Sequence, residues 1–305
     1  MNLWRRYWFT PTPVVNLAVS RLVLVAIVLW MGPMARPERV ALAPDAMWKP
    51  VATVKSLGLE KPSLETARTV GTATLVACAA AAMGLFTHTA FAVLAVLFFV
   101  QEAWAISLGK VSHAVFPLMY ALVFFAVAPA GNVLSVDAWW RRWRGDPPVR
   151  LSEYARWPID LVYLQLSAFY LSAGLSKLRY AGLAWADGYT LQFHLLGGGR
   201  PLAEWMASSI WLCTAASVAV LFWELTFFLG IYRPLRPFYL VGGFAFHVGT
   251  NVLMGIGFIP TMAIYAIFVP WSRMADWITQ LFVPSSTTTG SPGPPAAEPG
   301  DLPPT

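Results

Sequence analysis

The sequence predicts an all-α protein, a polytopic transmembrane helical bundle of about eight spans with a disordered C-terminal tail. Of its 305 residues, 57% are apolar and only 12% are charged, whereas soluble domains carry about 25% charged residues. Long apolar runs recur along the chain, and the segment from Ser285 onward is rich in Ser, Thr, Gly and Pro. The mean hydropathy is +0.59. This composition excludes a disordered chain, a disulfide scaffold and an ordinary cytosolic enzyme.

The apolar runs are matched to the length that a membrane-spanning helix needs, about 20 residues at a rise of about 1.5 Å each. The last run is short and follows a turn at residues 257–260, so it either re-enters the membrane or continues into the amphipathic stretch 274–282. The predicted runs are residues 14–34, 69–86, 90–108, 114–132, 158–178, 208–231, 237–256 and 259–272.

The Lys and Arg residues lie mainly between the apolar runs, as membrane topology requires, which argues against nucleic-acid binding despite the formal net charge of +6. They divide almost equally between the two sides, but without the long acidic loop 35–68 they favour the side of the N-terminus. We therefore predict a multi-pass protein of the plasma (inner) membrane with both termini in the cytoplasm. The expected parts are a cytoplasmic N-terminus (1–13), a transmembrane domain (14–272), an amphipathic segment (273–284) and a disordered tail (285–305).

The two cysteines, Cys78 and Cys213, lie inside apolar runs and lack the spacing of metal ligands. We interpret both as small core residues, so neither a disulfide nor a metal site is expected. No cleavable signal peptide is predicted either, because the first run is long enough to span the membrane and no small-residue cleavage site follows it.

The fifth run carries a polar stripe. Six residues with successive spacings of 3, 4, 3, 4 and 3 fall on one face of a helix, and they either line a polar cavity or pack as a polar seam. In the seventh run, His247 and Asn251 share a face in the same way. The stripe consists of Asp160, Tyr163, Ser167, Tyr170, Gly174 and Lys177.

The predicted topology places a candidate site at the Lys177 end of this stripe. His113 opens the fourth run and Lys177 closes the fifth, so both are expected at the external face. A desolvated lysine loses its charge readily, which suits a general base. The candidate catalytic residues are therefore Lys177, His113 and His247, and the candidate substrate-cavity residues are Tyr170, Ser167, Glu102 and Asn251.

Each ionisable residue in these runs also has a structural interpretation. Lys177 lies near a helix end, from which its side chain can extend to the headgroups, and we expect the same of Arg21. His113 lies near a loop boundary, where a solvated histidine is ordinary. Glu224 can pair with an arginine and so hold two helices together.

Three segments together resemble a known family. Residues 109–140 read GKVSHAVFPLMYALVFFAVAPAGNVLSVDAWW, residues 169–193 read FYLSAGLSKLRYAGLAWADGYTLQF, and residues 245–260 read AFHVGTNVLMGIGFIP. They resemble the HTTM family, the membrane domain shared with vitamin K-dependent gamma-carboxylase. The most specific motif is AGLSKL followed by Trp185 and Gly188.

The resemblance implies a cofactor and a chemistry. In the carboxylase, the lysine of the AG-xx-K motif is the base toward a reduced naphthoquinone, whose oxygenation yields a stronger base that removes a glutamate γ-proton before CO2 adds. Lys177 stands at that lysine, and His113 and His247 match family histidines. The implied cofactor is therefore a reduced, vitamin K-type naphthoquinone, and the implied partners are membrane lipid and a lipid-soluble quinol.

Other functions stay open at this point. The carboxylase has a long lumenal domain, whereas this chain is expected to leave its last run near residue 272. An accessory role in the maturation or export of a secreted peptide or protein is therefore an alternative to an enzyme of carboxylase or quinol-oxygenase type. A transporter or channel would rest on the buried charges alone, since no internal repeat is visible. A polar stripe that merely packs helices is the fourth possibility.

Overall fold

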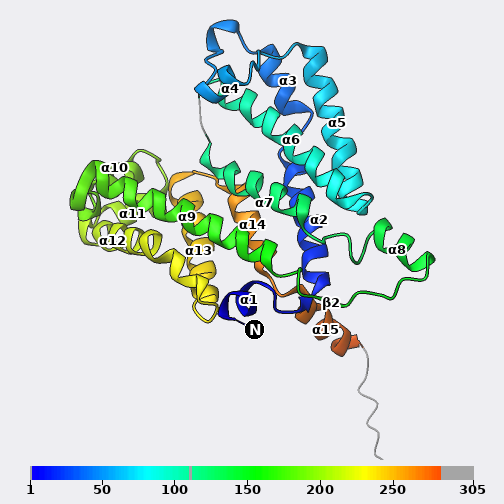
Figure 1. Cartoon of the computed structure of the whole chain (residues 1–305). Helices are drawn as coiled ribbons and strands as arrows, with labels where there is room; N and C mark the ends of the chain where they lie inside the picture. Colours follow the sequence, from blue (N-terminus) through cyan, green and yellow to red (C-terminus); the bar gives the residue numbers. More distant parts are fainter. Residues whose placement is uncertain (1, 110–111, 283–305) are drawn as a thin grey trace, which may run out of the picture. The chain divides into compact units, whose positions relative to one another are not determined.

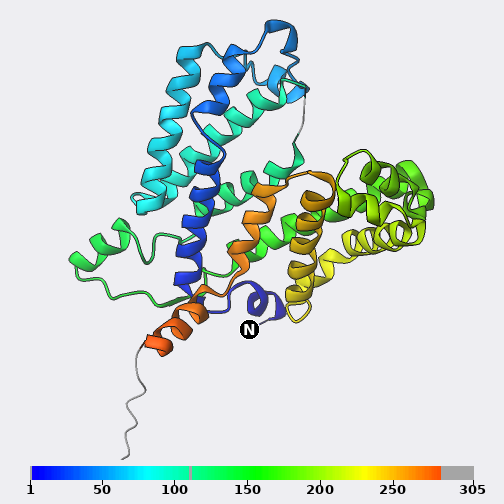
Figure 2. The same ribbon diagram turned by 180° about the vertical axis from the view of Figure 1, so that it is seen from behind.

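A computed structural model describes residues 2–109 and 112–282, and it confirms the all-α class (Figures 1 and 2). The described residues fall into two units, one that extends to Trp271 and one that begins at Ser272. The expected disordered tail lies outside the described residues. The helices are α1 (Leu3–Trp8), α2 (Val14–Trp30), α3 (Ala35–Leu42), η1 (Asp45–Met47), α4 (Ala52–Ser56), α5 (Leu64–Met83), α6 (Thr87–Ile106), η2 (His113–Val115), α7 (Phe116–Val127), α8 (Val136–Trp143), α9 (Trp157–Ala181), η3 (Gly182–Asp187), α10 (Tyr189–Leu196), α11 (Pro201–Ala207), α12 (Ile210–Thr226), η4 (Phe227–Ile231), α13 (Arg236–Met254), α14 (Ile259–Ile264), η5 (Tyr265–Phe268) and α15 (Trp271–Phe282).

Four helical stretches of the described chain are long and apolar enough to cross a membrane. The runs predicted at 69–86 and 237–256 also form long helices, α5 and α13. Thr, Gly and, in α13, Asn interrupt these two sequences, so both helices are less apolar than the four stretches. The chain is thus a membrane protein, and the exact number of spans stays a prediction. The four stretches are Val14–Leu42, Thr87–Ile106, Trp157–Asp187 and Ile210–Ile231.

The fourth and eighth predicted runs form shorter helices than their apolar length suggested. The stretch His113–Val127 ends where Ala128 adopts an extended conformation, because the residue before a proline is disfavoured in the helical region and Pro129 follows. The last apolar stretch covers only Ile259–Phe268. An antiparallel ribbon pairs Thr12 of β1 (Thr12–Pro13) with Ser152 of β2 (Leu151–Ser152).

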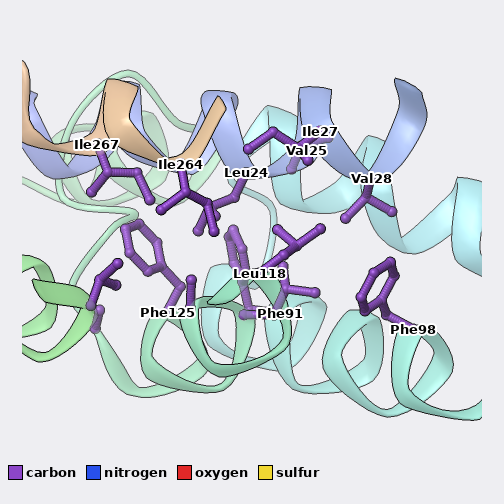
Figure 3. Close-up of a cluster of buried hydrophobic side chains, with 14 of the residues drawn as sticks. Leu24, Val25, Ile27, Val28, Phe91, Phe98, Leu118, Phe125, Ile264 and Ile267 are labelled. Carbon is purple, nitrogen blue, oxygen red and sulfur yellow. The ribbon is translucent and has the colours of Figure 1, made fainter. Parts of the chain in front are cut away.

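The main hydrophobic core lies where α2, α6, α7 and the α14–η5 segment meet. Figure 3 shows Leu24 of α2 close to Phe91 and Leu118, and Val28 of the same helix opposite Phe98. Because helices in a membrane are held together largely by van der Waals contact between packed side chains, this cluster joins segments that are far apart in the sequence. A second, smaller cluster joins Leu195, Ala203, Ala207 and Cys213.

Arg21 departs from expectation, since its side chain does not extend to the headgroups. The residue is 0% exposed. Its guanidinium donates to the carbonyl oxygens of Ala130 at 2.9 Å and Ala82 at 3.2 Å, and also to that of Leu134. Ala82 lies in the last turn of α5, where carbonyls lack helical partners. Arg21 therefore ties α2 to the end of α5 and to the loop after α7.

Candidate functional site

Helix α9 carries three of the seven candidate residues, Ser167, Tyr170 and Lys177. Pro158 lies in its first turn, where the missing N–H is tolerated, and α9 packs against α12 (Figures 1 and 2). The predicted stripe is the face that α9 buries against the bundle. Its first five members, from Asp160 to Gly174, are buried, and the Lys177 side chain at its end is 24% exposed.

Lys177 forms an ion pair across the α9–α12 interface. Its Nζ lies 2.7 Å from each carboxylate oxygen of Glu224, which is only 3% exposed. The same ammonium lies 5.0 Å from the centre of the Trp185 ring, a distance at which a cation is attracted to an aromatic face. Gly174 allows this close approach, because a Cβ there would lie 3.2 Å from the Glu224 Cβ.

A second polar cluster lies two turns earlier on α9. The Tyr170 hydroxyl is 2.6 Å from Nε2 of His247 in α13 and 2.9 Å from the hydroxyl of Tyr265 in η5. All three residues are buried. The Nδ1 atom of His247 has no hydrogen-bond partner among the described residues. Three elements therefore join their polar groups at one point, with one nitrogen of His247 left for another partner.

Aromatic rings surround the Tyr170 hydroxyl cluster. The rings of Trp223 and Phe227 each have their centre 4.6 Å from that of Tyr170, and Phe258 lies 5.2 Å from the His247 ring. In such an environment hydrogen bonds and charges interact more strongly than in water. The hydrogen bonds of the Tyr170 hydroxyl are therefore expected to be stronger here than they would be in water.

Glu102 and His113 lie apart from both clusters. Glu102 accepts from both terminal nitrogens of Arg36 in α3, one of them at 2.7 Å. His113 is exposed and packs against the Phe116 ring at 5.7 Å. Neither has a hydrogen bond or ion pair with Lys177 or His247 in the described structure. The structure therefore places Glu102 and His113 in contacts of their own, with Arg36 and Phe116, and does not join them to Lys177 or His247.

The two remaining candidates make local contacts. The Ser167 hydroxyl donates to the Tyr163 carbonyl one turn earlier, at 2.8 Å, which is a common arrangement inside helices. The backbone carbonyl of Asn251 accepts a hydrogen bond from Nη1 of Arg200 at 3.0 Å. Neither hydrogen bond joins these residues to the clusters around Lys177 and Tyr170.

Sequence reasoning missed two partners. Glu224 was expected to pair with an arginine, but it pairs with Lys177, and its position as the one carboxylate inside its apolar run was the available signal. Tyr265 gave no signal, since a tyrosine in a short apolar run is ordinary. Within residues 2–109 and 112–282, no group of three His, Cys, Asp or Glu could hold a metal ion.

The fold and these buried polar clusters define an integral membrane protein with ionisable groups inside its helical bundle. A family model described as the HTTM domain matches residues 9–277. The chain therefore belongs to the HTTM-domain family, which confirms the resemblance to that family. No curated protein and no solved structure matches the chain.

Proposed function

We propose that this chain is a membrane enzyme that acts on a lipid-soluble quinol, with Lys177 as its proton acceptor. The ion pair between Lys177 and Glu224 is the observation that carries the proposal. A charged residue inside a membrane span costs about 2.5–3.5 kcal/mol on insertion scales. Two apolar residues can replace a buried ion pair with little or no loss of stability. Helix packing alone therefore accounts poorly for the pair.

The pair can supply an uncharged amine. In the proposed cycle a proton moves from the Lys177 Nζ to a Glu224 oxygen, which leaves both groups uncharged. The 2.7 Å separation is a direct path for that proton. Once it has moved, the neutral Lys177 amine can accept a proton from an acidic hydroxyl, and Glu224 holds the first proton meanwhile.

The residues around Tyr170 fit a quinol. Nδ1 of His247 and Nε1 of Trp223 are buried without a hydrogen-bond partner among the described residues, so both can bind a ring oxygen. Trp223 also lines an apolar groove of about 420 Å³ between α12 and α13, which suits an aromatic ring system. When bound, a reduced naphthoquinone would supply the oxidisable ring that the family resemblance implies. Tyr170 would then orient His247 through its hydroxyl, which in turn is hydrogen-bonded to the hydroxyl of Tyr265.

Quinone epoxide formation tests the proposal. The purified protein in nanodiscs is given reduced naphthoquinone, oxygen and bicarbonate, and products are measured by mass spectrometry. We expect epoxide from the wild type and none above background from Lys177→Met, which keeps the aliphatic stem and removes the amine.

The matched control is Arg36→Met, which breaks a buried ion pair outside the clusters. We expect this variant to form epoxide in proportion to its folded fraction, measured by size-exclusion chromatography. Equal epoxide yields from Lys177→Met and the wild type would refute the role of Lys177. A wild type that forms no epoxide would refute the enzyme and favour an accessory role with a secreted peptide.

A further inference from the structure

A cluster of arginines surrounds Asp160 at the opposite end of α9 from Lys177. Arg233 and Arg236 donate to its two carboxylate oxygens at 2.7 and 2.6 Å, and Nε of Arg156 lies 3.8 Å away. The Asp160 side chain is 2% exposed. One buried carboxylate is thus shared by three guanidinium groups.

The cluster has more positive than negative charge. Among the described residues, the guanidinium of Arg156 has only its 3.8 Å contact with Asp160, and Nε of Arg233 is buried without a partner. Burial, followed by repulsion from Arg233 and Arg236, lowers the pKa of Arg156. A single Asp160 therefore leaves this site short of negative charge and with N–H donors to spare.

The arginines line a cavity that adjoins an apolar groove. The cavity has a volume of about 250 Å³ and is lined by Arg156, Arg233, Arg236 and Asp160 together with Thr12. The groove runs between α13 and α14, measures about 1000 Å³, and is almost wholly apolar. The two hollows share the side chains of Pro237, Leu240, Phe268, Val269 and Pro270 as a common wall.

We propose that this pair of hollows binds an anionic membrane lipid, with its headgroup phosphate among the arginines and an acyl chain along the α13–α14 groove. Arg recognises phosphate through paired N–H donors, and basic pockets between membrane helices take anionic headgroups. The cavity is smaller than the roughly 300–1,000 Å³ typical of drug-sized ligands, so it suits a headgroup and not a whole lipid. The groove supplies the apolar surface that the chain requires.

The position of the cluster favours a lipid over a free anion. Asp160 lies in the first turn of the apolar stretch Trp157–Asp187, and Arg233 follows the end of Ile210–Ile231 by two residues. The arginines therefore lie at span ends, where headgroups are found. Tyr7 of α1 supports them, since its ring lies 4.2 Å from the Arg233 guanidinium.

Lipid-dependent thermal unfolding of the delipidated full chain in detergent tests the site. The probes are phosphatidylglycerol, phosphatidylcholine and inorganic phosphate. We expect phosphatidylglycerol to raise the unfolding temperature at concentrations where the other two do not. Arg156→Gln, which leaves Asp160 two arginine partners, should weaken the apparent affinity about tenfold, as loss of a charge-assisted hydrogen bond predicts.

Two further variants complete the test. The exposed Arg142→Gln makes the same charge change outside the cavity and should bind phosphatidylglycerol like the wild type. Ala245→Trp fills the groove from an exposed position and should weaken phosphatidylglycerol binding. An equal effect of phosphatidylcholine, a shift by inorganic phosphate as large as that by the lipid, or an equal loss in Arg142→Gln would each overturn the proposal. Epoxide formation is a separate readout, so either proposal can fail alone.

Discussion

Gly243 of α13 has the Tyr265 hydroxyl where a larger residue would carry its β-carbon. An added Cβ would lie 2.1 Å from that oxygen and 2.6 Å from Cζ2 of Trp223, distances at which atoms overlap. The hydroxyl is held in place by Tyr170, so it has little freedom to withdraw. The Tyr170–His247–Tyr265 cluster therefore depends on the absence of a side chain at Gly243.

We predict that Gly243→Ala lowers the free energy of unfolding in detergent by about 1–3 kcal/mol, the usual cost of overpacking. The matched control is Gly249→Ala in the same helix, where an added Cβ meets nothing within 4 Å. That variant should be neutral or more stable by up to roughly 1 kcal/mol, because alanine favours helix over glycine. A Gly243→Ala protein as stable as Gly249→Ala would show that the cluster can rearrange.

The candidate site was predictable in part. Spacing along α9 placed Tyr170 and Lys177 on the face that is buried, since a helix repeats every 3.6 residues. Spacing within one run says nothing about which residue of another run lies opposite. The pairing of Lys177 with Glu224, and of Glu102 with Arg36, is set by helix packing and appeared only in the structure.

At the scale of elements, α5 and α6 begin in different ways. Ser63 caps α5 with its own side chain, which accepts from the Thr66 N–H at 3.1 Å. The residue before α6 is Phe86, in a left-handed conformation and without a side-chain cap. The N-terminus of α6 is instead capped by Asp137 of α8, whose carboxylate accepts from the backbone N–H groups of Phe86 and Thr87 at 2.8 Å.

The carboxylate of Asp137 makes the stability of the fold depend on pH. Partial burial by itself would raise the pKa of Asp137, but hydrogen bonds from Thr87 and Phe86 outweigh it and lower the pKa from the usual value of about 3.9. The carboxylate therefore stabilises the fold above about pH 4, and this contribution is lost as the pH falls through the lower pKa of the folded protein.

The unfolding temperature of Asp137→Asn should accordingly be below that of the wild type at pH 7, and the difference should shrink between about pH 4 and pH 2 as Asp137 itself becomes protonated. Asp146→Asn, in an exposed loop, is the matched control for the change in charge. A difference between wild type and Asp137→Asn that stays constant over this range would mean that the carboxylate charge does not hold the start of α6.

At the scale of the molecule, many large apolar side chains lie on the surface. They include Trp211, 81% exposed, and Phe193, 75% exposed. Lipid tails accommodate such side chains, whereas water would not. The exposed apolar surface and the four long apolar stretches support the same conclusion, that this surface faces a bilayer.

Cysteine labelling tests the predicted orientation. The native Cys78 and Cys213 are 1% and 0% exposed, so an introduced surface cysteine should dominate the reaction. A membrane-impermeant maleimide should label Glu60→Cys in intact cells, and Arg142→Cys only after the membrane is permeabilised. The opposite pattern would place the termini outside the cytoplasm.

The fold class followed from composition, because only a bilayer accommodates so apolar a chain. The ends of individual helices were predicted less accurately from the sequence. Pro129 ended a helix inside a run that hydropathy alone extended to residue 132, and the proline was a visible signal. Arg21 was misjudged because the sequence of one run does not show which groups lie opposite it, and the carbonyls that hold Arg21 come from segments distant in the sequence.

Arg21 has a consequence for biosynthesis. The chain is made from its N-terminus, so α2 leaves the ribosome before the segments that contain Ala82, Ala130 and Leu134 exist. An arginine without partners costs about 2.5–3.5 kcal/mol at the centre of a membrane helix. Until α5 and the loop after α7 have been translated, the nascent α2 therefore carries this cost without the hydrogen bonds that offset it. Two of the carbonyl groups that accept from Arg21, those of Ala130 and Leu134, are synthesised more than 100 positions later.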